Sequence, residues 1–221
     1  IYGNIYSLFI VGKLFNDKEI LELVYKTIDI FKKYDDKENK DNKENKIDII
    51  GGFSGILLVI LSIYEETKQE NLKNLMDKLY TLIKENALIS SDGIMCDENG
   101  YTGFAHGNAG IIFALYKYYL VSKNDDVLAL SEQALKFERI RFDEEASNWK
   151  RELNKEGYQV SWCHGSAGIL MSKILLKKSG YTDNYIDKEI EVAFQSIMDD
   201  GFGFDFCLCH GDLGNLLIMY Y

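Results

Sequence analysis

Four segments of the chain share one pattern, a Gly-x-x-Gly start followed by an apolar run. They read GGFSGILLVILSIY from Gly51, HGNAGIIFALYKYY from His106, HGSAGILMSKILL from His164 and HGDLGNLLIMYY from His210. Their leading glycines are Gly52, Gly107, Gly165 and Gly211, so the spacings are 55, 58 and 46 residues. Gly3 begins a weaker copy, 49 residues before Gly52. Self-similarity at such a period indicates a repeat architecture.

Polar stretches with apolar residues at helical spacing lie between these segments. Residues 17–31, 71–83, 125–137 and 187–198 read as amphipathic helices with one wet face. Each repeat is therefore a buried helix and an amphipathic helix, an αα-hairpin that must stack or close into a ring to bury its apolar face. The absence of proline beside 18 glycines fits a largely helical chain. We expect an all-α fold.

Charge and composition exclude several partners and compartments. With 25 basic and 35 acidic residues the net charge is -10, which argues against a nucleic-acid partner. No apolar run reaches the roughly 18 residues of a membrane span, and no signal peptide begins the chain. Four cysteines are too few for a disulfide scaffold, so we expect a cytoplasmic protein whose clustered cysteines bind metal or do chemistry.

The domain boundaries are read from the two ends and from one polar stretch. The chain starts at Ile1 without a methionine and stops inside the apolar run 216–221, so we expect one domain, 1–221, that is a piece of a longer protein. Residues 33–46 read KYDDKENKDNKENK, and we expect a solvated, charged loop insertion there.

The three histidines of the chain each open a repeat. They are His106, His164 and His210, and a cysteine directly precedes the last two, as Cys163 and Cys209. In the Gly52 repeat an acid, Asp48, lies three residues before Gly51. Glycines at the start of buried helices let backbones approach closely, so the residues before them should meet at one end of the array. We expect one functional site there.

Zinc is the natural metal for such a set, because it prefers thiolate sulfur and imidazole nitrogen. A closed structural site wants four protein ligands, often in CxxC spacing, whereas this chain has C-x-C at 207–209 and a lone Cys163. Three ligands from separate loops with an open fourth position are typical of a catalytic zinc.

The sequence resembles the lanthionine synthetase C-like family. The resemblance is carried by SWCHGSAGI at 161–169, CLCHGDLGN at 207–215, GFAHGNAGI at 103–111 and IDIIGGFSGI at 47–56. It runs over nearly the whole chain, and the wording is most similar to the C-terminal cyclase domain of class II, bifunctional lanthipeptide synthetases. The family's fold is an α/α toroid of about seven hairpins. We expect this toroid here, incomplete at both ends, because the last one or two hairpins are missing.

The resemblance implies a site and a reaction. Cys163, Cys209 and His210 would hold Zn²⁺, with His106 and Asp48 as acid/base residues beside it. The reaction would add a cysteine thiol of a dehydrated lanthipeptide precursor to dehydroalanine or dehydrobutyrine, giving a lanthionine or methyllanthionine ring. The resemblance also implies a fused N-terminal dehydratase domain, none of which is present in this sequence.

The roles of the neighbouring residues stay open. His164 is either a catalytic acid/base group or a hydrogen-bond partner near the metal. We expect Cys207 to lie outside the ligand set, Cys96 to be an ordinary thiol and Trp162 to pack beside the site. An aspartate, Asp212, is placed to face backbone N–H groups at a helix start.

Two other functions compete with the cyclase. One is a non-catalytic zinc module that binds a thiol such as glutathione or a peptide, which would not need His106 and Asp48. The other is an α/α-toroid glycoside hydrolase, which needs two placed carboxylates and leaves the Cys-His pairs unexplained.

Overall fold

The structure is a computed structural model that describes residues 2–32 and 47–221. The charged insertion expected at 33–46 lies outside the described residues. Helices dominate the described part of the chain. Their bounds are α1 Tyr2–Leu14, α2 Lys18–Lys32, α3 Phe53–Thr67, η2 Glu70–Leu72, α4 Lys73–Asn86, α5 Asn108–Ser122, α6 Asp125–Ile140, α7 Ser166–Lys178, α8 Ile186–Asp200 and α9 Asp212–Tyr220.

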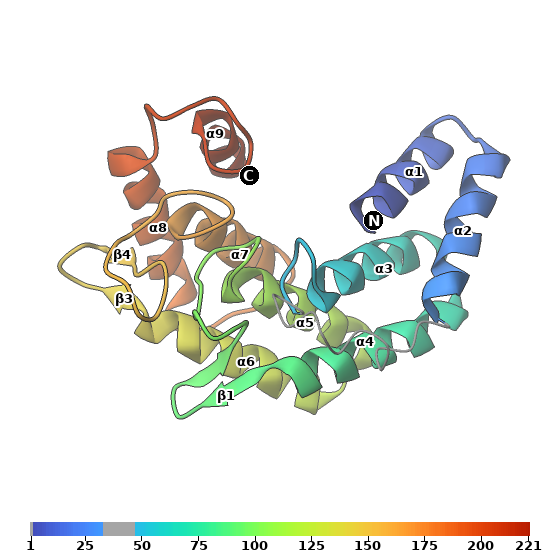
Figure 1. The fold of residues 1–221 in the computed structure, drawn as a ribbon, viewed down its shortest axis with the longest axis horizontal. Coiled ribbons are helices and arrows are strands. Elements are labelled where there is room, and N and C mark those ends of the chain that lie inside the picture. The colour runs from blue at the N-terminus through green and yellow to red at the C-terminus, as the bar shows by residue number, and fades with distance from the viewer. Residues whose placement is uncertain (1, 33–46) are drawn as a thin grey trace.

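The helices form an arc of two layers (Figure 1). Consecutive helices pair as hairpins, α1 with α2, α3 with α4, α5 with α6 and α7 with α8. The first helices of these pairs contact one another in the order α1, α3, α5, α7, α9 and make the inner layer. Helices α1 and α9 lie at the two ends of the arc, next to the termini (Figure 1). The αα-hairpin repeat expected from the sequence is confirmed.

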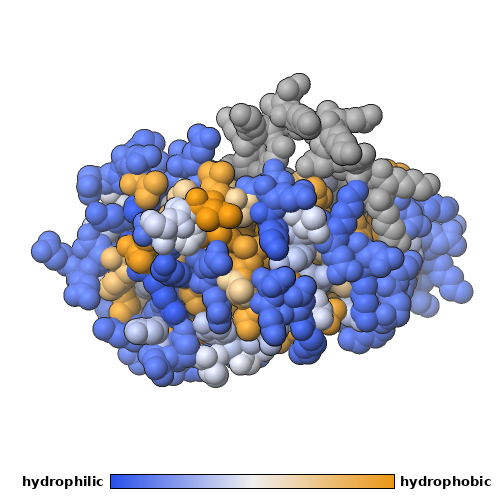
Figure 2. All heavy atoms as spheres, turned by 90° about the horizontal axis from the view of Figure 1, so that it is seen from below, coloured by the Kyte–Doolittle hydropathy of each residue, from blue (hydrophilic) through white to orange (hydrophobic). Residues whose placement is uncertain are grey.

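The two layers differ in how they are buried. Inner helix α5 is buried on several sides, whereas outer helix α4 buries one stripe, consisting of Leu75, Met76, Leu79 and Ile83. Seen from the side of α4 and α6, the surface is mostly hydrophilic with apolar strips between (Figure 2). The four amphipathic helices predicted from spacing are therefore the outer layer, with ends that differ from the expected ones by a few residues.

Side chains fix where the outer helices begin. The Asp17 carboxylate accepts the backbone N–H groups of Glu19 and Ile20 at 3.0 and 3.1 Å, before α2. The Asn124 side chain accepts the N–H of Asp126 at 3.0 Å, before α6. Such caps satisfy donors that have no partner inside the helix.

Two short β-hairpins interrupt the helical array and were not expected. Strands β1 Leu88–Ser90 and β2 Gly93–Met95 pair antiparallel, as do β3 Phe142–Asp143 and β4 Asn148–Trp149. Each hairpin follows an outer helix and lies in the connection to the next inner helix. They are too short to give an alternating pattern that the sequence could show.

A buried network of charges joins α6, α7 and α8. Lys173 of α7 and Glu138 of α6 are fully buried, with the ammonium nitrogen 2.6 Å from a carboxylate oxygen. The same ammonium lies 3.4 Å from Glu189 of α8, and Arg139 lies 2.6 Å from Glu189 and from Asp183. Buried charges require such partners, so the network fixes how these three helices sit together.

The loops that precede the inner helices are hydrogen-bonded to one another. The N–H of Ile49 donates to the carbonyl of Ala105 at 3.0 Å, and that of Phe104 to Trp162 at 3.0 Å. The N–H of Cys163 donates to the carbonyl of Cys209 at 3.3 Å. Four loops separated by about fifty residues each thus lie side by side along the arc, at the same end of the inner helices, as the repeat spacing predicts.

Candidate functional site

The Asp48 and His106 side chains form a pair between two neighbouring loops. His106 Nδ1 lies 2.8 Å from Asp48 Oδ2, and the other oxygen of the carboxylate accepts the N–H of Gly51 at 2.8 Å. Asp48 is buried, whereas His106 is 31% exposed at its side chain. A carboxylate that accepts from Nδ1 fixes the tautomer, so Nε2 is the nitrogen that can exchange a proton with a bound molecule.

His164 lies against His106 rather than with the cysteines. The two imidazole rings stack with their centroids 5.2 Å apart, and the ring of Tyr101 lies 4.7 Å from that of His164. Burial, together with the charges of Arg151 and His106, lowers the pKa of His164 to about 4. Its Nδ1 is buried and has no hydrogen-bond partner among the described residues. The ring is therefore neutral at neutral pH.

Three potential ligands meet where the last two loops touch. One atom each of Cys163, Cys209 and His210 lies within 4.8 Å of the other two. Cys163 is buried, Cys209 is half-buried and His210 is exposed. The Ser161 hydroxyl lies 3.3 Å from the Cys163 sulfur and also bonds the backbone of His164, so it holds the first loop in shape.

The donor set suits zinc. Zinc–sulfur and zinc–nitrogen distances of about 2.3 and 2.1 Å at tetrahedral angles place ligand atoms about 3.5–3.8 Å apart, so the three atoms need to move little. In the metal-free cluster, burial and contact with the Cys163 thiol raise the pKa of the Cys209 thiol to about 11. A bound cation reverses this preference, because it favours the thiolates.

A second, overlapping group includes two residues of the last loop. Asp205, Cys207 and His210 also place one ligand atom each within 4.8 Å of one another. His210 Nε2 lies 3.3 Å from an Asp205 oxygen, and Asp205 also accepts the N–H of Cys207 at 2.8 Å. Sequence reasoning did not single out Asp205 or Ser161. Their only signal is an acid or a hydroxyl two residues before a cysteine, Asp205 before Cys207 and Ser161 before Cys163.

Three other expectations have structural outcomes. Trp162 stacks on Phe104 with ring centroids 6.1 Å apart, which confirms that it packs beside the site. Cys96 is buried, and burial raises the pKa of its thiol well above the usual value. Asp212 faces backbone N–H groups at the start of α9, as expected, and its carboxylate accepts those of the preceding loop, from Gly203 at 3.0 Å and Phe204 at 3.4 Å.

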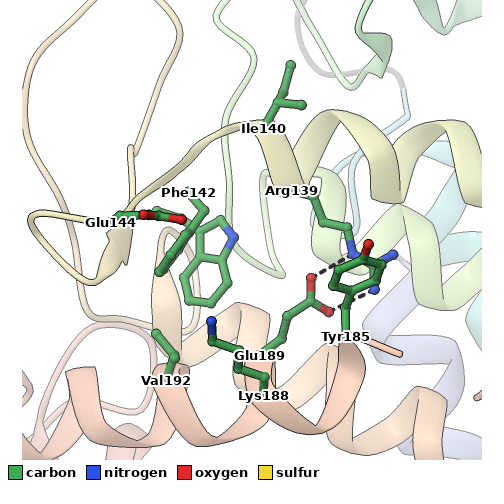
Figure 3. A pocket seen from close by; sticks show the side chains of 9 residues that line it. Arg139, Ile140, Phe142, Glu144, Tyr185, Lys188, Glu189 and Val192 are labelled. Atoms are coloured by element: carbon green, nitrogen blue, oxygen red, sulfur yellow. Dashed lines mark hydrogen bonds and ion pairs between the residues drawn. The ribbon is translucent and has the colours of Figure 1, made fainter. Parts of the chain in front are cut away.

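One well-formed cavity lies away from all of these residues. It has a volume of about 480 Å³ and lies between the end of α6, the β3–β4 hairpin and α8. Figure 3 shows Arg139 extended toward Glu189, with Tyr185 beside it and Val192 farther along α8. No candidate site residue lines this cavity, so we assign it no part in the site.

Comparison with known proteins decides the family. A family model described as lanthionine synthetase C-like protein matches residues 1–221, the whole chain. The chain belongs to this family.

Two curated relatives are similar in sequence. The lacticin 481/lactococcin biosynthesis protein LcnDR2 of Lactococcus lactis subsp. lactis is 26% identical over 92% of this chain. The glutathione S-transferase LANCL1 of Danio rerio is 30% identical over 52% of it. The chain spans about a quarter of the length of each, 26% and 28%.

Solved structures share the fold. Nisin cyclase matches with a TM-score of 0.76 at 22% identity, over 99% of this chain and 62% of its own. An alpha-1,6-mannanase of Salegentibacter matches with a TM-score of 0.60 at 13% identity, over 92% of this chain and 61% of its own. The expected α/α toroid is confirmed as the fold of this lanthionine synthetase C-like chain. Within residues 2–32 and 47–221, none of the helices combines the length and apolarity that crossing a bilayer demands.

Proposed function

We propose that the chain is the cyclase part of a lanthipeptide-modifying enzyme, which joins a peptide cysteine to dehydroalanine or dehydrobutyrine. The observation that carries this proposal is a cluster of two thiols and an imidazole on loops bonded to the loop of His106. The N–H of His106 lies 3.4 Å from the carbonyl oxygen of Cys163. Family membership supports the proposal, as does the similarity to LcnDR2, a lacticin 481/lactococcin biosynthesis protein, and to nisin cyclase.

Cys163, Cys209 and His210 would hold the metal and leave one position open. A zinc ion held there would lower the pKa of a substrate thiol from about 8.5 and so favour the thiolate at neutral pH. Two thiolates and one neutral imidazole from the chain would balance the charge of such an ion and leave the substrate thiolate nucleophilic.

His106 and Asp48 would handle the proton. The sulfur attacks the β-carbon of the dehydro residue, a carbon–sulfur bond forms, and the electrons of the double bond move to the α-carbon and its carbonyl. His106 Nε2 would accept the proton that the substrate thiol loses and then deliver it to the α-carbon, and Asp48 would stabilise the imidazole ring while it is charged. No atom is gained or lost in this addition, so the product has the mass of the reactant.

The partners follow from the same proposal. The substrate is a dehydrated lanthipeptide precursor, and the likeness to LcnDR2, of which this chain spans a quarter, favours a dehydratase fused before Ile1. A thiol bound at zinc needs a reducing compartment, so we place the protein in the cytoplasm.

A second candidate is addition of a free thiol. The relative named glutathione S-transferase LANCL1 favours it, and the same metal and proton-handling residues would serve. The two candidates differ in the nucleophile. Incubation of a dehydrated, cysteine-free peptide with glutathione gives an adduct with added mass only if the second is correct, whereas ring closure leaves mass unchanged and removes a thiol.

The metal assignment is tested by zinc content of purified protein. We expect about one zinc per chain, lost in the Cys163→Ala, Cys209→Ala double variant together with ring closure. Cys207→Ala is the matched control, because Cys207 lies in the same loop, and it should keep both the metal and the activity. If the double variant kept its zinc and Cys207→Ala lost it, the ligands would instead be Asp205, Cys207 and His210. No zinc in folded protein would end the proposal.

A further inference from the structure

The ligand cluster borders two cavities that share no lining residue. The first has a volume of about 610 Å³ and is lined by His210 and by polar groups that include the carboxylates of Asp200 and Asp205. The second, of about 330 Å³, is lined by Cys209. A peptide whose cysteine reaches the open metal position must therefore leave the cluster beside one or both of these hollows.

The cavity beside Cys209 is apolar on nearly all sides. Its walls come from α7, α9 and the loops before them, and they consist of Trp162, Met171, Leu208, Cys209, Gly214, Leu217, Ile218 and Tyr221. None of these side chains carries a charge. A charged or strongly polar group placed there would lose its water without gaining a partner, whereas an aliphatic group would gain by leaving water.

The order of the loops places this cavity away from the proton-handling pair. The inner helices contact one another in the order α3, α5, α7, α9, and the walls use none of α3 or α5. His106 precedes α5, so the dehydro residue that it protonates must lie toward that helix. The residue beside the reacting cysteine is then free to turn the other way, toward α9.

We propose that this apolar cavity receives the aliphatic side chain of a residue adjacent to the reacting cysteine, and so selects which cysteine of a peptide is used. This inference rests on the proposed function. Neighbouring Cα atoms are 3.8 Å apart, so a side chain next to the bound cysteine reaches a cavity whose wall includes a metal ligand. Leu217 is the wall residue that can be altered most safely, because it is 50% exposed on α9.

The test measures thiolate binding to the full chain loaded with cobalt(II), without any reaction. The probes are two capped peptides, Ala-Leu-Cys-Leu-Ala and Ala-Ser-Cys-Ser-Ala, and the signal is the increase in thiolate-to-cobalt absorption over that of the protein's own Cys163 and Cys209 ligands. We expect the leucine peptide to bind about tenfold more tightly, as partial burial of a leucine side chain allows. Leu217→Gln should reduce this preference to about threefold or less.

Leu216→Gln is the matched control. Leu216 is the preceding residue of the same helix and is 53% exposed, but it does not line the cavity, so the tenfold preference should remain. Equal binding of the two peptides to the unaltered chain, or equal effects of the two variants, would overturn the inference and leave the proposed function standing. If neither peptide changes the thiolate-to-cobalt absorption, the proposed function itself is overturned.

Discussion

At the scale of single residues, His106 has one ring nitrogen hydrogen-bonded to Asp48, and the other is available for proton transfer. We expect His106→Asn to keep the metal and the fold but to slow ring closure by ~10²–10⁴-fold, the usual worth of general acid–base help. Asp48→Asn should cause a smaller loss in the same step, because the ring remains but its tautomer is no longer fixed. Alkylation of free thiols follows the reaction, since mass does not change.

Two outcomes would contradict this role for His106. Rings that form at the normal rate in His106→Asn would show that another group delivers the proton. Loss of the metal in the same variant would make His106 a ligand. Zinc content and circular dichroism of each variant are the controls that separate the two.

The sequence was enough to find those residues whose chemistry repeats with the fold. His106, His164 and His210 are rare residues at equivalent positions, and Cys163 and Cys209 directly precede the last two, so the repeat alone predicts that their loops meet. Asp205 could not be found in that way, because aspartate is common in polar loops and only the folded loop brings it to 3.3 Å from His210.

At the scale of elements, the loops pack closely against the inner helices because these helices carry glycine. A Cβ atom on Gly110 of α5 would lie 2.1 Å from the carbonyl oxygen of Phe104 and 2.3 Å from the Ile49 side chain. Gly110→Ala should therefore lower the free energy of unfolding by about 1–3 kcal/mol, measured by urea denaturation.

The matched substitution is Gly3→Ala in α1, where nothing lies within 4 Å of the new atom. Alanine favours helix over glycine by up to about 1 kcal/mol, so this variant should be slightly more stable. Shifts of the same sign and size in both variants would mean that Gly110 does not serve to let the loops approach α5 closely.

The buried Lys173–Glu138 pair links α6 to α7, and the sequence did not predict it. Lys173 interrupts the apolar run of its repeat, where a lysine would be expected to face water, and only tertiary packing shows that it is buried. Lys173→Met should cost about 3–5 kcal/mol of stability, because Glu138 is left buried without its partner. Adding Glu138→Leu should restore most of that loss. A double variant no more stable than the single one would contradict this account.

Acid should weaken the contact of α8 with α6. Burial by itself raises the pKa of Glu189, but the hydrogen bonds and charges of Arg139 and Lys173 outweigh it and lower the pKa. A lowered folded pKa means that the stabilisation is complete above the unfolded value of about 4.3 and is lost as pH falls through the folded value. The stability difference between the unaltered chain and Arg139→Gln should thus be full at pH 7 and shrink below about pH 4, by urea denaturation at each pH. A difference that does not change with pH would contradict it.

At the scale of the whole molecule, the metal would link the loop before α7 to the loop before α9. Cys163 precedes α7, and Cys209 and His210 precede α9. Removing zinc with a chelator should speed amide hydrogen exchange in 201–220 and leave α3 unchanged. Metal at a hundredfold excess over its dissociation constant stabilises by about 2.7 kcal/mol. Equal acceleration in α3 and α9 would mean that the repeats open as one unit.

Because the loops contact one another in chain order, the two parts of the site can form only one after the other during translation. Translation proceeds from the N-terminus at about 5–20 residues per second, and repeat units fold as their neighbours become available. Asp48 and His106 can meet once the third hairpin has left the ribosome, yet His210 is made 104 residues after His106 (210 minus 106). The metal ligands are therefore completed on the order of ten seconds after the Asp48–His106 pair. A nascent chain would thus form the Asp48–His106 pair before it can bind the metal.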